Sequence, residues 1–189
     1  TPDALGPDVV SNLRITRHVI QEYGVQSMGK EYANSISGLV PGVMAQTGME
    51  TLEIIRGVVD ETKPDVVFAV DALAARSTKR LNRTIQITDT GINPGSGVGN
   101  HRNGLSEETL GVKVIGIGVP TVVDAATIVQ DSMAHLLDTL EESEKKEFLE
   151  EMISPSLHSM FVTPKDVDET VKRLSYTISE GLNMAFEQA

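Results

Sequence analysis

Residues 65–70 read D-V-V-F-A-V, a continuous apolar run that follows a single acidic residue. A run this short, bounded by Lys63-Pro64 on one side and Asp71 on the other, is typical of a strand in a parallel sheet that is covered on both faces. A helical pattern comes before it over residues 47–62, opened by T-G-M-E as a capping box. This helix–strand succession favours an α/β fold.

Further helical and strand patterns follow along the chain. An alternating strand is expected over residues 84–89, with Ile85 and Ile87 facing inward. Further elements are predicted as helices over residues 7–24, 121–140 and 164–182 and as strands over residues 36–40 and 112–119. We therefore predict one α/β domain over residues 1–189: a three-layer, doubly wound, mostly parallel sheet with helices on both faces. A domain of this type usually has a strand before its first helix. We expect that upstream strand to be missing here; the alternative is a sheet that begins at Ile36.

Composition narrows the function classes. The chain has 189 residues, no Cys and a formal net charge of −11. Without Cys there is no thiol nucleophile and no thiolate metal site. The acidic balance argues against a nucleic-acid partner, and the absence of a long apolar run argues against a membrane one. Residues 111–189 carry most of the acid excess, including a glutamate-rich run over 141–151 that we interpret as a solvated helix face or linker.

Two carboxylates are the first candidates for chemistry. In open α/β sheets, sites lie beyond the carboxyl ends of the strands, and Asp71 directly follows the apolar run. Asp3 lies before the first helix, at the same sheet edge if a strand preceded it. Two close carboxylates tend to share one proton, so one can activate a water while the other donates to the carbonyl oxygen. The alternatives are a helix cap for Asp71 and an exposed turn residue for Asp3.

A glycine-rich loop over residues 89–104 is the next candidate. It contains G-S-G-V-G at Gly95, Gly97 and Gly99, which matches neither the dinucleotide nor the phosphate-loop pattern. Sixteen residues without a helix or strand are long for a compact domain. The glycines would let the backbone approach an extended peptide closely. A surface loop without function and a non-catalytic anion-binding module remain the alternatives.

The loop also carries Asp89 and His101, which we predict to support the carboxylates. Together with Asp3 and Asp71 these residues could provide oxygen and nitrogen ligands to a metal ion. No tight ligand spacing such as H-E-x-x-H supports that interpretation.

Basic residues cluster just after Asp71 although the chain is acidic: Arg76, Lys79, Arg80 and Arg83. An Arg guanidinium binds a carboxylate with two parallel hydrogen bonds. The cluster therefore predicts recognition of a substrate carboxylate, with Arg76 and Arg80 as candidates. Ordinary solvated surface charge is the alternative.

Seven segments together resemble one family, the spore germination protease. They are T-P-D-A-L-G (1–6), N-L-R-I-T-R-H (12–18), V-P-G-V-M-A-Q-T-G-M-E-T (40–51), D-A-L-A-A-R-S (71–77), D-T-G-I-N-P-G-S-G-V-G-N (89–100), G-V-P-T-V-V-D-A (118–125) and M-F-V-T-P-K-D-V-D (160–168). The resemblance covers nearly the whole chain.

The resemblance implies an endopeptidase that begins degradation of small acid-soluble spore proteins during germination, in the cytoplasm of the spore core. It implies a zymogen that loses a propeptide by self-cleavage, a homotetramer, and no cofactor. It also implies an atypical aspartic protease with Asp3 and Asp71 as the catalytic pair. The fold is similar to that of the hydrogenase maturation endopeptidases, in which the matching carboxylates bind nickel, so a metal-assisted endopeptidase is the alternative.

This chain departs from the family pattern in two places. The family has roughly a hundred further residues upstream, including the propeptide and a first central strand. The region between about residues 138 and 155 is also shorter than the family pattern leads us to expect.

Overall fold

The computed structural model describes residues 1–31, 33–95, 103–138 and 140–188. In chain order the elements are η1 (Pro2–Ala4), α1 (Leu5–Ser11), α2 (Arg17–Tyr23), η2 (Val25–Met28), α3 (Met44–Thr47), α4 (Thr51–Thr62), β1 (Val66–Ala75), η3 (Thr78–Arg80), β2 (Gln86–Thr88), α5 (Glu107–Leu110), β3 (Lys113–Asp124), α6 (Ala125–Ser132), α7 (Ala134–Leu137), α8 (Glu142–Met152), η5 (Pro155–Ser159), β4 (Phe161–Val162) and α9 (Val167–Gln188).

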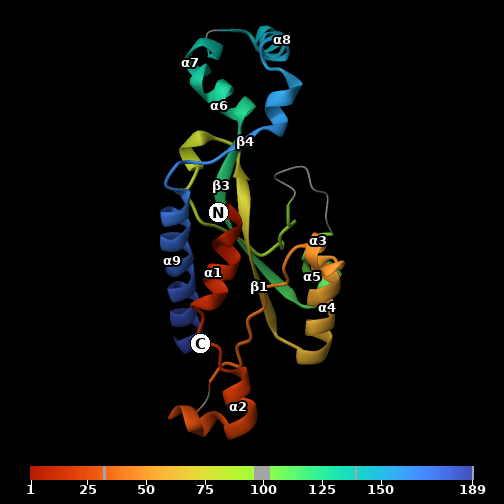
Figure 1. Ribbon diagram of the computed structural model, residues 1–189, viewed down its shortest axis with the longest axis vertical. Helices are drawn as coiled ribbons and strands as arrows, with labels where there is room; N and C mark the ends of the chain where they lie inside the picture. The colour runs from red at the N-terminus through yellow and green to blue at the C-terminus, as the bar shows by residue number, and fades with distance from the viewer. Residues whose placement is uncertain (32, 96–102, 139, 189) are drawn as a thin grey trace.

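The sheet is built around β3. β1 pairs with β3 in parallel along almost its whole length, from Val66 opposite Lys113 to Ala75 opposite Val123. The short strands β2 and β4 both pair with β3 antiparallel. The sheet is therefore mixed, and the expected mostly parallel character is limited to its one long pair of strands (Figure 1).

Helices cover both faces of the sheet, which confirms the α/β layering. Side chains of β1 alternate between the faces: Phe68 and Val70 pack with α1 and α9, whereas Val67 and Ala69 pack with α4 and α5. In Figure 1, α1 and α9 lie side by side and α4 and α5 lie across the strands from them. A strand covered on both faces has to be apolar throughout, as residues 66–70 are.

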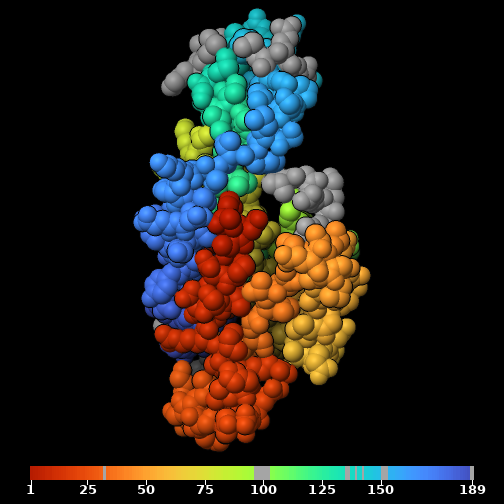
Figure 2. Space-filling view, viewed as in Figure 1, coloured from red at the N-terminus to blue at the C-terminus, as the bar shows by residue number. Residues whose placement is uncertain are grey.

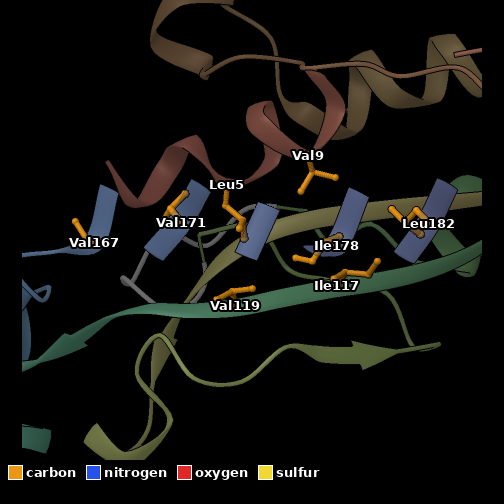
Figure 3. Packing of buried hydrophobic residues seen from close by; sticks show 8 residues of the cluster. All are labelled: Leu5, Val9, Ile117, Val119, Val167, Val171, Ile178 and Leu182. Atoms are coloured by element: carbon orange, nitrogen blue, oxygen red, sulfur yellow. The ribbon is translucent and has the colours of Figure 1, made fainter. Parts of the chain in front are cut away.

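The larger core lies between α1, α9 and β3. Its buried side chains point toward one another in Figure 3: Leu5, Val9, Ile117, Val119, Val167, Val171, Ile178 and Leu182. The helix predicted over residues 164–182 is confirmed as part of α9, and four of these residues lie on it at helical spacing, so its apolar stripe faces the core. Complete burial of a leucine such as Leu5, which is 0% exposed, stabilises the fold by about 1.5–3 kcal/mol. The rings of Phe68 and Phe186 add an edge contact, with centroids 5.3 Å apart.

Several predicted helix boundaries were wrong. The helix expected over residues 7–24 is two helices: α1 ends at Ser11, and α2 begins only at Arg17. The helix expected from Thr47 begins at Thr51, where Glu50 and Glu53 form the capping box. The helix expected over residues 121–140 ends at Ser132, and its first four residues belong to β3.

Two predicted strands also differ. Residues 36–40 form no strand, because the Ile36 carbonyl accepts the amide protons of Thr16 and Arg17 at the start of α2 instead of pairing in a sheet. β2 is only three residues long, and the inward orientation expected for two isoleucines was wrong: Ile85, just before β2, is 37% exposed, and Ile87 within it is 71% exposed. Alternation identifies the strand but not which of its faces is covered.

The remaining helices project from the two ends of the molecule along its long axis. α6, α7 and α8 gather at one end, and α2 and η2 at the other (Figure 1). α8 contains the glutamate-rich run, so this run is a helix. Within the described ranges, no helix has the length and hydropathy needed to cross a bilayer.

Candidate active site

Asp71 lies inside β1, not beyond it. The strand continues for four residues past Asp71, to Ala75, and Asp71 is opposite Gly118 of β3. Both sequence interpretations of its position, the end of a strand and the cap of a helix, were therefore wrong. The strand continues because its partner β3 extends to Asp124 and offers a backbone partner at each step.

The pairing becomes irregular just after Asp71. Leu73 is opposite Pro120 and Ala74 is opposite Val122, which leaves Thr121 as an extra residue in β3. Such bulges bend a strand and redirect its side chains, and they are frequent next to active sites. Asp71 is half-buried, and its Oδ1 accepts the amide proton of Ala72 at 2.9 Å. Its carboxylate therefore lies along the backbone of β1 at the point where the strand changes register.

Asp3 lies in η1, and its side chain is exposed. η1 contacts β1, so the segments that carry Asp3 and Asp71 are neighbours. The first turn of α1, which directly follows η1, also lies close to β1, because a Cβ added at Gly6 would lie 3.1 Å from the Val70 carbonyl oxygen. η1 belongs to the layer of α1 and α9, however, whereas alternation along β1 directs Asp71 toward the layer of α4 and α5.

The surface near these two segments is not flat. In the space-filling view it is hollowed between the N-terminal residues, in red, and the orange segment that contains α3 (Figure 2). Yellow residues of β1 are seen at the floor of this hollow.

The basic cluster directly follows β1. Arg76 and Arg80 are exposed, and η3 begins at Thr78. The hydroxyl of its N-cap residue, Ser77, accepts the amide proton of Lys79. The turn is held from outside by Asp131 of α6, which lies more than fifty residues further along the chain. Hydrogen bonds from the Thr78 side chain and then from its backbone lower the pKa of Asp131 below its usual value of 3.8.

The glycine-rich loop is closed at its base. Ile92 and Leu105 form an antiparallel bridge with hydrogen bonds of 2.9 and 2.8 Å. Asp89 is exposed just before this bridge, and Gly95 within the loop has a φ of +72°. Positive φ is a backbone conformation that glycine adopts without the steric cost of a Cβ. Gly97 lies outside the described residues.

His101 also lies outside the described residues, so its predicted supporting role stays a prediction. In the described part of the chain, no three His, Asp or Glu side chains come together closely enough to hold a metal ion. Asp3, Asp71 and Asp89 thus do not assemble a cation site by themselves.

Sequence reasoning missed three polar residues near the carboxyl end of β1. Asp131 lies on a helix remote in sequence, and no motif marks it. Asn82 has a positive φ of +56°, a conformation that Asn tolerates better than most residues, and its amide donates to the Pro120 carbonyl at 2.7 Å. Among the described residues, the side-chain amide of Asn82 and the hydroxyl of Thr121 are buried without a hydrogen-bond partner.

The sequence is similar to known proteins along its whole length. A family model described as germination protease matches residues 1–140 and 134–189. The chain is 48% identical to the germination protease of Caldanaerobacter subterraneus subsp. tengcongensis, with 99% of the chain and 62% of that relative covered. It is 45% identical to the germination protease of Clostridium tetani and 42% identical to that of Bacillus subtilis, with all of the chain and 63% of each relative covered.

The lengths of these alignments carry information too. The chain spans less than two thirds of each of these relatives. The Bacillus subtilis alignment extends over 237 positions against 189 residues, so that relative has additional residues inside the matched span. The family model matches in two pieces that meet near residues 134–140, and together these pieces cover every residue. The chain belongs to the germination protease family.

Proposed function

We propose that this protein is an endopeptidase that begins the degradation of small acid-soluble spore proteins during germination, in the spore core. Membership of the germination protease family supports the peptidase class and the link to germination. The observation that carries the site is the contact between η1 and β1, since these two elements bear the only aspartates in the two family-like motifs T-P-D-A-L-G and D-A-L-A-A-R-S.

The proposed reaction uses a water held between Asp3 and Asp71. Because alternation directs Asp71 toward the layer of α4 and α5, the two carboxylates would meet at this water around the edge of β1, which has a strand neighbour on one side only among the described residues. The ionised carboxylate removes a proton from the water as its oxygen attacks the peptide carbonyl carbon. The protonated carboxyl group donates its hydrogen to the carbonyl oxygen and so stabilises the tetrahedral intermediate. When the C–N bond breaks, the leaving amine takes up a proton and the carbonyl re-forms, so no covalent intermediate with the protein is needed.

Substitution of the two aspartates tests this proposal in an active preparation of the protein. Asp71→Asn and Asp3→Asn remove one proton donor or acceptor each, and general acid–base catalysis typically contributes about 10²–10⁴-fold to the rate. Asp60→Asn is the matched control, because Asp60 is an exposed aspartate on α4 whose ion pair with Lys63 spans 3.6 Å. Full activity of Asp71→Asn, with unchanged circular dichroism, would rule out the carboxylate pair.

A chelator separates the pair from the alternative of a metal-assisted endopeptidase that uses Asp3, Asp71 and His101. Cleavage that continues unchanged after dialysis against a chelator supports catalysis by the carboxylates alone. Cleavage that stops and is restored by a divalent cation supports the metal-assisted alternative.

Recognition of the substrate is proposed for the basic cluster and the glycine-rich loop. Arg76 and Arg80 would bind an acidic side chain beside the scissile bond, and the loop, including Gly95 and Gly97, would lie along the extended substrate. Charge reversal of Arg76 and Arg80 should weaken cleavage of acidic substrates selectively. An equal loss on acidic and neutral peptides would refute this recognition.

The finer architecture is proposed as well. We infer a doubly wound sheet like that of the hydrogenase maturation endopeptidases, with one further strand beside β1. Among the described residues, β1 has a strand neighbour on one side only, and the relatives are longer than this chain. We also propose a zymogen, self-cleavage of a propeptide and a homotetramer. Light scattering of the protein in solution and mass spectrometry before and after activation test these three features.

A further inference from the structure

Asp131 joins two parts of the chain through a single oxygen atom. Its Oδ2 accepts hydrogen bonds from the Thr78 amide at 2.6 Å, the Thr78 hydroxyl at 2.7 Å and the Ser77 hydroxyl at 3.1 Å. Ser77 is also the residue that caps η3 through the Lys79 amide. The turn between β1 and η3 is thus tied to α6 by one carboxylate.

The Asp131 carboxylate accepts hydrogen bonds from the backbone and hydroxyl groups of the turn and forms none with Arg76 or Arg80. Arg76 and Arg80 flank the bonded residues Ser77 and Thr78, and both are exposed. None of the ion pairs between described residues includes either arginine. The turn is therefore held on one side while its guanidinium groups stay available to an anionic ligand.

The position of the turn relative to the proposed site follows from β1. Four residues lie between Asp71 and Arg76, and this stretch of backbone is paired with β3 as far as Ala75. The strand fixes the first arginine at one end of the turn. η3 is a single short turn of helix. After the strand has ended, the turn is therefore fixed at its start by the bonds to Asp131 and beyond its end by the Asn82 amide, which donates to the Pro120 carbonyl at 2.7 Å.

We propose that Asp131 is a positioning residue for substrate specificity: it holds the Ser77–Thr78 turn so that Arg76 and Arg80 face an acidic side chain of the peptide bound at β1. This inference rests on the proposed function, in which those arginines recognise the substrate. Preorganised cations bind a carboxylate more tightly because less freedom is lost on binding. Asp131 itself touches no reacting atom in this scheme.

The test compares three variants of Asp131 with a control. Asp131→Ala removes the acceptor, Asp131→Asn keeps an acceptor oxygen without the charge, and Asp131→Glu keeps the charge on a longer side chain. Asp138→Asn is the matched control, because Asp138 is an exposed aspartate of the same region with no part in the turn. Circular dichroism of each variant establishes that it is folded.

Two readouts separate positioning from mere structural support. Hydrogen exchange at the Thr78 amide should rise at least about 10-fold in Asp131→Ala, because a bond to a charged acceptor is lost. KM for an acidic peptide should rise about 10-fold with kcat nearly unchanged, whereas KM for a neutral peptide of the same length should stay within about 2-fold. The KM of Asp131→Asn for the acidic peptide should lie between that of Asp131→Ala and that of the unmodified protein. Asp131→Glu should have a lower KM for this peptide than Asp131→Ala.

The results that overturn the proposal differ from those that overturn the proposed recognition. If charge reversal of Arg76 and Arg80 raises KM for the acidic peptide but Asp131→Ala does not, Asp131 is not a positioning residue. If Asp131→Ala raises KM for both peptides equally, its role is structural and the proposal also fails. If charge reversal of the arginines has no effect on KM, recognition by the basic cluster is wrong and the inference falls with it.

Discussion

Replacement of Gly91 by alanine should open the base of the glycine-rich loop. Gly91 has a φ of +87°, a conformation that costs a residue with a Cβ roughly 1–2 kcal/mol. The added Cβ would also lie 2.1 Å from the Leu105 carbonyl oxygen, against 3.4 Å or more in ordinary contact. Because the obstacle is backbone, the chain has to move by about an ångström rather than a side chain rotating away.

This displacement breaks the bridge next to it. The bridge consists of the bonds from Ile92 to Leu105 and back, and each contributes about 1 kcal/mol net. Together with the backbone strain, the free energy of unfolding should fall by about 3–4 kcal/mol for Gly91→Ala. For a chain of this size that corresponds to a melting temperature lower by about 6–16 °C.

The assay is thermal and urea denaturation followed by far-ultraviolet circular dichroism, because the chain has no Trp for fluorescence. Gly57→Ala is the matched control: Gly57 lies inside α4 and an added Cβ meets nothing within 4 Å. That substitution should stabilise the protein by about 0.5–1 kcal/mol. The predicted clash at Gly91 is refuted if the free energy of unfolding of Gly91→Ala lies within about 0.5 kcal/mol of that of the unmodified protein while Gly57→Ala stabilises the protein.

Three further substitutions test other parts of the structure. Leu5→Ala should lower the free energy of unfolding by about 2–5 kcal/mol, because Leu5 of α1 is fully buried in the core against α9 and β3. A loss of less than about 1 kcal/mol in urea denaturation would contradict this packing. Ile87→Ser should change it by less than about 0.5 kcal/mol in the same assay, since Ile87 is 71% exposed, and a large loss would mean that another surface covers β2. Asp131→Asn should destabilise the protein at neutral pH. Because the pKa of Asp131 is lowered in the folded state, the stability that its carboxylate contributes is present above about pH 3.8 and is lost as the pH falls below that value. The melting temperatures of Asp131→Asn and the unmodified protein should therefore converge only in that acid range, and convergence already at about pH 6 would refute this prediction.

Local patterns in the sequence were sufficient for the layered α/β arrangement. The apolar stripe of α9 and the buried positions Leu52 and Val59 of α4 follow from helical periodicity, which depends only on neighbours along the chain. The apolar run in β1 likewise indicated a strand covered on both faces, and helices do pack on both. The sequence motifs were also sufficient to indicate the germination protease family.

Pairing and long-range contacts decided the rest. Asp71 lies within β1 because β1 continues for as long as it can pair with β3. The local sequence around Asp71 does not show how far that pairing extends, because β3 is distant in the sequence. The exposure of Ile87 could not be predicted from the alternating pattern, because both faces of a strand have the same two-residue period. Asp131 reaches Thr78 from another helix 53 residues further along the chain, so only the tertiary structure could bring this carboxylate to the basic turn beside the candidate site.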